Sequence, residues 1–176
     1  MKTLIYTVGH STRPIEDFIE LMKTYAIETV VDVRKIAQSR HNPQYGEDAL
    51  RKRLSESGIS YLRFEGLGGL RPTTPDSVNT GWKNKSFRGY ADYMQTSEFE
   101  ENIEKLIALA AELQTVIMCA EAVPWRCHRS LIGDALVIRG IEVNDIISES
   151  RCTPHKLTSF AKVEGDTIIY PPSEGG

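Results

Sequence analysis

The sequence predicts an α/β fold: a mostly parallel β-sheet flanked by helices on both faces. Short apolar or β-branched segments alternate with amphipathic helical segments, and each helix of such a chain carries it back across a sheet face. Hydrophobic residues make up 40% of the chain and charged residues 26%, which is ordinary for a globular protein. Its 176 residues can bury a core without disulfides, and we expect residues 1–176 to form a single α/β domain.

The first half of the chain contains three predicted strands and two predicted helices. Residues 4–8 predict the first strand, and a proline then opens a helix over residues 14–25, in which apolar side chains recur at helical spacing. Residues 29–33 are mostly β-branched and predict a central strand. A helix is expected over residues 47–57, where a glycine follows it, and residues 59–64 predict the third strand.

A long irregular segment, residues 65–86, follows and is rich in glycine and proline. Loops of this length in compact domains often cover a binding site. A short helix is predicted over residues 87–94. The clearest helix of the chain is predicted over residues 97–113, with an apolar stripe and a capping box formed by Ser97 and Glu100.

The last part of the chain predicts a strand, a helix and another strand. The strand covers residues 115–119, and a proline opens a helix expected over residues 124–139. Residues 141–147 predict the next strand, and the chain is less regular after it. Residues 167–170 are expected to form an edge strand, and residues 171–176 to be a frayed end.

Composition limits the class of protein. No apolar run approaches the ~20 residues needed to cross a bilayer, so we expect no membrane association. Three cysteines without a framework spacing argue against a disulfide-built secreted domain and favour a reducing cytoplasm. A net charge of −3 and a pI near 5.8 give no global attraction to nucleic acid. The sequence leaves the oligomeric state open.

The charges are distributed unevenly. Residues 34–53 and 71–90 are basic and loop-like, whereas residues 98–112 are acidic and helical. Charged runs of this kind are commonly solvated faces. The contrast also fits a basic cavity mouth on an acidic body.

Polar residues gather where the predicted strands end. Because ligands of open α/β sheets bind outside the carboxyl ends of the strands, this edge is the expected site. The richest segment runs from residue 118 to residue 129, where a strand ends in a cysteine and a helix start follows. The residues that meet at the edge are His10, Ser11, Asp32, Arg34, Cys119, Glu121, Cys127, His128 and Arg129.

These residue types predict thiol chemistry on an anion. A cysteine near a helix start and between arginines tends towards thiolate, so Cys127 is expected to be the nucleophile or an acid–base group, with His128 as its partner. Arg34 and Arg129 are expected to clamp the anion. Asp32 and Glu121 are expected to orient these groups as part of the catalytic set.

The remaining predicted binding residues complete the pocket. His10 and Ser11 are expected to form its floor. The loop of residues 65–90 is expected to cover it, with Arg88 contributing charge and Tyr90 an aromatic face on which a base can stack.

Several of these residues also have structural explanations. Cys119 alternates with a buried isoleucine and is expected to be a small buried hydrophobe. His128 could serve as a cap, Glu121 as a surface turn residue and Asp32 as a loop anchor.

Three other chemistries were weighed for the cysteine segment. An anion-binding loop of the phosphatase or sulfurtransferase type fits poorly, because the segment between Cys119 and Arg126 includes a proline without an N–H group and a glutamate. Metal binding lacks paired ligand spacing, so no metal and no cofactor is expected. A redox pair of Cys119 and Cys127 stays open.

Together these motifs resemble an uncharacterised bacterial and archaeal family, the domain of unknown function numbered 488. They span residues 4–147 and comprise Thr7-Val8-Gly9-His10-Ser11, Asp32-Val33-Arg34, Leu67-Gly68-Gly69, Phe87-Arg88-Gly89-Tyr90-Ala91-Asp92-Tyr93-Met94, and Met118-Cys119-Ala120-Glu121 through Cys127-His128-Arg129. The family's second motif continues with a proline that this chain lacks, so we expect a differently shaped loop there. The resemblance implies a small α/β domain with a shared polar site and brings no established reaction.

Two functions follow as hypotheses. The first is a small cytoplasmic enzyme that acts on an anionic substrate, such as a nucleotide or a nucleic-acid fragment, at the Cys/His/Arg site. The second is a module that binds a nucleotide or nucleic acid through the basic segments without transforming it.

Overall fold

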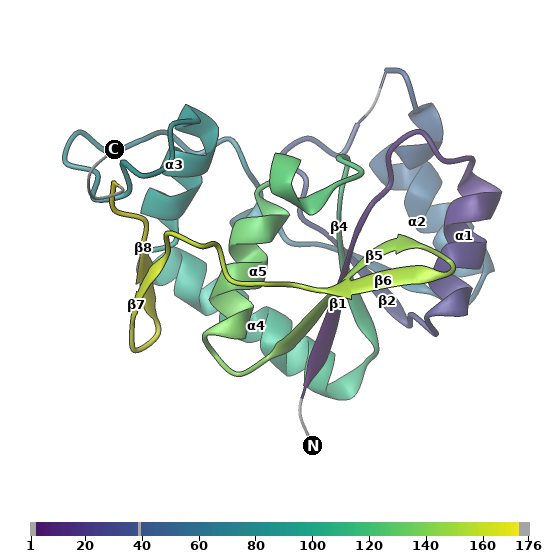
Figure 1. The fold of residues 1–176 in the computed structure, drawn as a ribbon. Helices are drawn as coiled ribbons and strands as arrows, with labels where there is room; N and C mark the ends of the chain where they lie inside the picture. The colour runs from purple at the N-terminus through teal and green to yellow at the C-terminus, as the bar shows by residue number, and fades with distance from the viewer. Residues whose placement is uncertain (1–2, 39, 173–176) are drawn as a thin grey trace.

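The computed structural model describes residues 3–38 and 40–172. Its main sheet has six strands in the order β3-β2-β4-β1-β5-β6, and every neighbouring pair is parallel except β5 with β6. Figure 1 shows this sheet between two groups of helices. The strands are β1 (Leu4–Gly9), β2 (Thr29–Asp32), β3 (Ser60–Arg63), β4 (Thr115–Cys119), β5 (Glu142–Ser148) and β6 (Arg151–Pro154).

Helices cover both faces of the sheet, which confirms the predicted fold class. Two of them, α1 and α2, lie on one side, and α3, α4 and α5 lie on the other (Figure 1). The helices are α1 (Ile15–Thr24), α2 (Glu47–Glu56), α3 (Lys85–Tyr93), α4 (Ser97–Glu112) and α5 (Arg129–Val137), with three short 3-10 turns, η1 (Pro43–Tyr45), η2 (Glu65–Leu67) and η3 (Pro124–Arg126).

The central strands are buried on both faces because successive side chains of a strand point in opposite directions. In β4, Val116 and Met118 pack in the core under α1 and α2. Ile117 and Cys119 of the same strand belong to the core under α3, α4 and α5. Cys119 therefore ends a buried strand with its side chain on the α5 side of the sheet.

The chain changes its winding direction between β1 and β4. It leaves β1 for β2 by crossing over β4, and later leaves β4 for β5 by crossing over β1. Gly9 and Cys119 are register partners at the carboxyl ends of these two strands. A Cβ atom on Gly9 would lie 1.5 Å from the Glu121 carbonyl oxygen, so only glycine lets the loop after β4 cross so near. Such a switch point is where α/β sheets hold ligands.

The helix predicted over residues 124–139 forms only in part. Residues Pro124–Arg126 make a 3-10 turn, Cys127 is extended (φ −138°, ψ 148°), and α5 begins at Arg129. The prediction that Cys127 lies in the first turn of that helix is therefore wrong. The extended backbone at Cys127 ends the 3-10 turn before the α-helix starts.

Two further corrections concern local signals. The N-cap of α4 is Thr96, whose hydroxyl accepts from the Phe99 N–H at 3.3 Å, so Ser97 and Glu100 do not form the predicted capping box. The chain after β5 is more regular than predicted. It adds β6 at the sheet edge and a separate two-stranded sheet of β7 (Lys162–Glu164) and β8 (Thr167–Ile169).

The strand predicted over residues 167–170 exists, but it pairs with β7 and not with the main sheet. The frayed end predicted over residues 171–176 falls mostly on residues 173–176, which lie outside the described residues. Within the described ranges, none of the helices is long and apolar enough to cross a membrane.

Candidate functional site

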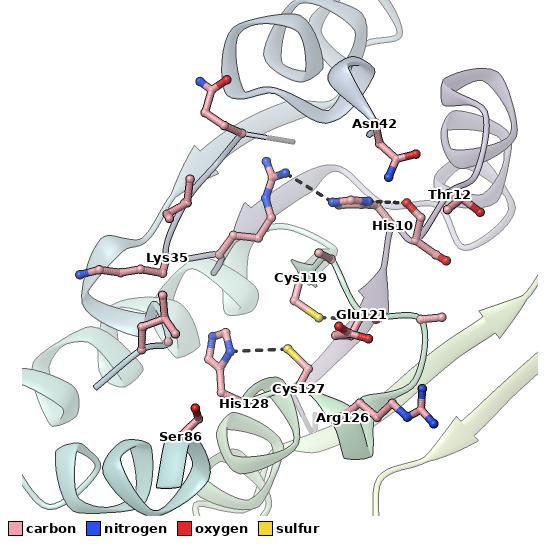
Figure 2. A pocket seen from close by; sticks show the side chains of 18 of the residues that line it. His10, Thr12, Lys35, Asn42, Ser86, Cys119, Glu121, Arg126, Cys127 and His128 are labelled. Carbon is pink, nitrogen blue, oxygen red and sulfur yellow. Dashed lines mark hydrogen bonds between the residues drawn. The ribbon is translucent and has the colours of Figure 1, made fainter. Parts of the chain in front are cut away.

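A cavity of about 680 Å³ opens at the switch point, above the carboxyl ends of β1, β2 and β4. Pockets of this size commonly hold small-molecule ligands. Its wall combines residues from all three strand ends with the segment before α5 (Figure 2). The lining includes six of the predicted site residues, which are His10, Ser11, Arg34, Glu121, Cys127 and His128.

Two thiols lie together in this wall. Cys119 ends β4, and Cys127 lies just before α5; both are buried, with 2% and 7% of their surface exposed. Figure 2 shows the two sulfur atoms turned towards one another, with Cys119 hydrogen-bonded to the Glu121 carbonyl oxygen at 3.6 Å and Cys127 to Nδ1 of His128 at 3.5 Å. The two cysteines, whose proximity the sequence left open, therefore face each other across one cavity wall.

The two thiols have opposite proton affinities. Burial opposes ionisation of Cys119, but the hydrogen bond from Cys127, the charge of Arg129 and a backbone hydrogen bond with Glu121 together lower its pKa. The hydrogen bond with Cys119 and burial raise the pKa of Cys127. The directions of the two shifts therefore favour Cys119 as the thiolate and leave Cys127 protonated.

The ring of His128 accounts for the position of the Cys127 proton. Its Nε2 lies 2.8 Å from the Val33 carbonyl oxygen, an acceptor, so Nε2 carries the hydrogen. Burial lowers the pKa of His128 to about 4 and keeps the ring neutral at pH 7, which leaves Nδ1 with a lone pair. Nδ1 lies 3.5 Å from the sulfur of Cys127, so the single hydrogen of this thiol has two alternative acceptors, this nitrogen and the sulfur of Cys119.

The guanidinium of Arg129 lies beneath the thiols. It is fully buried and donates to the hydroxyl of Thr7 at 2.8 Å and to the carbonyl oxygens of Glu121 and Ala122 at 3.1 Å each. These bonds fix the loop after β4, while the positive charge stabilises a thiolate at Cys119. Arg129 does not line the cavity, so it positions and charges the site instead of clamping an anion directly.

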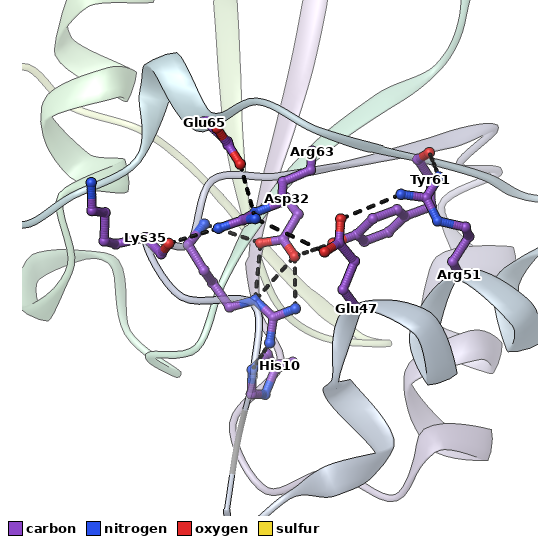
Figure 3. A network of polar contacts seen from close by, with 9 residues as sticks. His10, Asp32, Lys35, Glu47, Arg51, Tyr61, Arg63 and Glu65 are labelled. Carbon is purple, nitrogen blue, oxygen red and sulfur yellow. Dashed lines mark hydrogen bonds and ion pairs between the residues drawn. The ribbon is translucent and has the colours of Figure 1, made fainter.

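Arg34 follows the end of β2, lines the cavity and is paired with Asp32. Figure 3 shows Asp32 at the centre of this polar network, near His10 and Tyr61. The Nη2 and Nε atoms of Arg34 lie 2.7 and 2.9 Å from the two carboxylate oxygens of Asp32, and Tyr61 also donates to that carboxylate. Asp32 is fully buried behind Arg34 and does not line the cavity. It acts as a positioning residue, and its charge offsets part of that of Arg34.

His10 holds the other side of Arg34. Its Nδ1 donates to the Ser11 carbonyl at 2.8 Å, and its Nε2 lies 3.4 Å from Nη1 of Arg34. Burial, assisted by the nearby charge of Arg34, lowers the pKa of His10 to about 4. The ring is stacked on Tyr45, with centroids 4.1 Å apart, so a neutral His10 forms a rigid support for the guanidinium.

Besides Arg129, two more of the predicted binding residues, Tyr90 and Arg88, are not in the cavity wall. Tyr90 is fully buried and donates to the Leu67 carbonyl at 2.8 Å, so its face cannot stack a ligand base. Arg88 donates to the Trp82 carbonyl at 3.0 Å and holds the start of α3 against the preceding loop. Tyr90 and Arg88 therefore hold the segment of residues 65–90 in place through these hydrogen bonds.

The cavity also includes residues that the sequence reasoning missed. Lys35 and Arg126 contribute positive charge from opposite sides in Figure 2, against the carboxylate of Glu121. Gly69 comes so near His128 that a Cβ would lie 3.1 Å from Nδ1. The sequence placed Arg126 beside Cys127 without assigning it to the site, and Gly69 lies in a motif already quoted for the family. Phe87 lines the cavity as one of the aromatic residues of the loop that was expected to cover it. The other missed residues are Thr12, Ile36, Gln38, Asn42, Leu70, Ser86, Ala120 and Ala122.

A second buried network supports the base of the site. His155 Nε2 lies 2.9 Å from Asp134, and its Nδ1 lies 3.5 Å from Asp145. Asp145 in turn accepts from the hydroxyl of Thr7, which accepts from Arg129. Both ring nitrogens face carboxylates, so the doubly protonated ring satisfies both; burial opposes this state, but the two carboxylates raise the pKa of His155 to about 9.

Among residues 3–38 and 40–172, no group of three or more His, Cys, Asp or Glu side chains is arranged to hold a metal ion.

Comparison with protein families matches residues 14–136 to the family described as "Domain of unknown function DUF488". The match covers most of the chain and contains the ends of β2 and β4 together with all residues from Cys119 to Arg129. No curated protein and no solved structure matches the chain significantly.

Proposed function

The chain belongs to the DUF488 family, and from this premise we propose that it is an enzyme that acts on a small anionic substrate, nucleotide-like in size, by thiol chemistry at Cys119. The observation that carries the proposal is the thiol pair in the cavity wall, with the buried cation of Arg129 near Cys119 and the ring of His128 hydrogen-bonded to Cys127. A structural cysteine needs neither a buried cation nor an adjacent proton donor.

In this mechanism the Cys119 thiolate attacks an electrophilic carbon or phosphorus of the substrate. The leaving group takes the proton of Cys127, whose sulfur shares its hydrogen with Nδ1 of His128. Water then cleaves the covalent adduct, and its proton returns to Cys127. Arg129 holds Cys119 ionised between turnovers, so it acts without touching the substrate.

The charge of the cavity defines the substrate class. Lys35 and Arg126 lie in the lining with Arg34, and among the described lining residues Glu121 alone has an acidic side chain. Because Arg34 is paired with Asp32, Lys35 and Arg126 supply most of the uncompensated positive charge. A phosphate or carboxylate group between them would place the rest of a small molecule over the thiols.

Protection against alkylation tests the proposal. A nucleoside monophosphate at millimolar concentration is expected to slow iodoacetamide labelling of Cys119 in wild type, and to protect less when Lys35 and Arg126 are both replaced by alanine. Replacing Lys162, an exposed lysine of β7 that lies outside the lining, is the matched control. Equal labelling with and without every anion tested would contradict the anionic substrate class.

Turnover distinguishes the enzyme from the binding module. If a protecting nucleotide is converted and the conversion disappears in Cys119→Ser, the enzyme is supported. If it protects but is recovered unchanged under all conditions, while binding weakens with salt and ignores Cys119→Ser, the module without catalysis is favoured.

A further inference from the structure

The thiol pair has a chemical consequence that does not depend on the substrate. Cys119 and Cys127 come from two separate segments, the end of β4 and the turn before α5, yet both line one cavity and their sulfur atoms face each other (Figure 2). The third cysteine, Cys152 on β6, is half-buried and packs against the core under α1 and α2, on the opposite face of the sheet. The chain therefore holds one paired and one isolated thiol.

We propose that the cavity is an oxidation site, at which a small hydroperoxide converts Cys119 and Cys127 to a reversible disulfide that closes the site. The inference shares with the proposed function the ionised state of Cys119, but it requires no substrate and no anion binding. Its class of reactant is a hydroperoxide, ROOH, of which hydrogen peroxide is the smallest member.

The first step consumes the peroxide. The sulfur of Cys119 attacks the nearer oxygen, the O–O bond breaks, and the departing RO⁻ takes up one proton and leaves as ROH. The product is a sulfenic acid at Cys119, in which sulfur has lost two electrons to the peroxide. The buried charge of Arg129 favours both the attacking thiolate and the negative charge on the departing oxygen.

The second step uses the neighbouring thiol. The sulfur of Cys127 attacks that of Cys119, the S–O bond breaks, and the hydroxide leaves as water with the hydrogen from Cys127. His128 Nδ1, 3.5 Å from that sulfur, can carry the hydrogen during the attack. In total, two thiols and one ROOH give one disulfide, one ROH and one water. A small dithiol such as dithiothreitol returns the pair to the reduced state by thiol–disulfide exchange.

The local backbone fits closure of this bond. Cys127 is extended between the 3-10 turn and α5, outside both helices, so a shift of its backbone breaks no hydrogen bond within α5. Cys119, by contrast, is fixed by pairing of β4 with β1 and β2. Formation of the disulfide would consume the Cys119 thiolate and so abolish any thiol chemistry in the cavity.

The test is treatment of the reduced full-length protein with equimolar hydrogen peroxide, followed by intact mass and peptide mapping. Wild type and Cys152→Ser are both expected to lose two hydrogens and give a crosslinked peptide containing Cys119 and Cys127, reversed by dithiothreitol. Cys127→Ser is expected to stop at the sulfenic acid, which dimedone traps at Cys119, and Cys119→Ser is expected to form no disulfide.

Two results would overturn the proposal. The first is that Cys119 and Cys127 both stay reduced in Cys152→Ser, although free glutathione added to the same sample as a control is oxidised. The other is a disulfide or a dimedone adduct at Cys152 in wild type with Cys119 untouched. If Cys119 is alkylated rapidly at neutral pH but gives no disulfide, the redox inference fails while the proposed function stands. If the disulfide forms but no anion protects Cys119, the proposed function fails instead.

Discussion

Replacing His155 by glutamine removes an imidazolium that joins two buried carboxylates. Asp134 and Asp145 are 0% and 5% exposed, and His155 lies between them with a hydrogen on each ring nitrogen. Glutamine keeps a hydrogen-bond donor but no charge. The variant should therefore lose the electrostatic part of this interaction and the pH dependence that comes with it.

The magnitude follows from the pKa. The pKa of His155 rises from the ordinary 6.5 to about 9 in the folded protein, because hydrogen bonds to Asp134 and Asp145 outweigh burial. At about 1.4 kcal/mol per pH unit, the protonated ring stabilises the fold by about 3 kcal/mol. Since the folded-state pKa is the higher one, this contribution is complete below pH 6.5 and is lost as the pH rises through 9.

Urea unfolding followed by tryptophan fluorescence at pH 6 to 10 measures this loss. The free energy of unfolding of wild type should fall across this range by about 3 kcal/mol more than that of His155→Gln. The control His41→Gln replaces an exposed histidine and should follow wild type. Parallel curves for wild type and His155→Gln would refute the assignment of a charged His155 in this network.

Three further predictions concern the cavity itself. Asp32→Asn should destabilise the protein by about 3–5 kcal/mol in urea unfolding, because it leaves the buried Arg34 guanidinium without its counter-charge; a loss below about 1 kcal/mol would contradict this. The pKa of His10 is about 4 in the folded protein, so the free energy of unfolding should fall as the pH drops from 6.5 to 4. In His10→Asn this fall should be smaller by up to about 3 kcal/mol in the same assay. An equal pH dependence in wild type and His10→Asn would exclude the neutral ring. Gly9→Ala should lower the free energy of unfolding by about 1–3 kcal/mol and slow alkylation of Cys119, because the new Cβ would meet the Glu121 carbonyl. Alkylation of Cys119 in this variant at the wild-type rate would show that the close passage of the loop over Gly9 does not shape the site.

The sequence predicted the architecture because strand and helix periods are local signals. The apolar segment that ends at Cys119 is β4, residue for residue, and the alternation of strands and helices placed His10, Arg34 and Cys119 at one sheet edge. Edge strand β6 was missed, since it is only four residues long, ends in proline and has no fully buried side chain.

Roles within the site could not be predicted from spacing. The contact between Cys119 and Cys127 depends on how the loop after β4 passes over Gly9, which is a tertiary event. The same folding buries Arg129 beneath the thiols and reverses the expected ionisation of the pair. Tyr90 looked like a stacking surface because its burial between helices leaves no trace in a short local motif.

The pH dependence of cysteine alkylation, resolved by peptide, tests the ionised Cys119 most directly. Labelling with iodoacetamide between pH 5 and 10 should show Cys119 reacting with a pKa below the ~8.5 of an ordinary cysteine, in wild type and in Cys152→Ser alike. Cys127 should react only at higher pH. Faster labelling of Cys127, or an ordinary profile at Cys119, would contradict the assignment of Cys119 as the thiolate above Arg129.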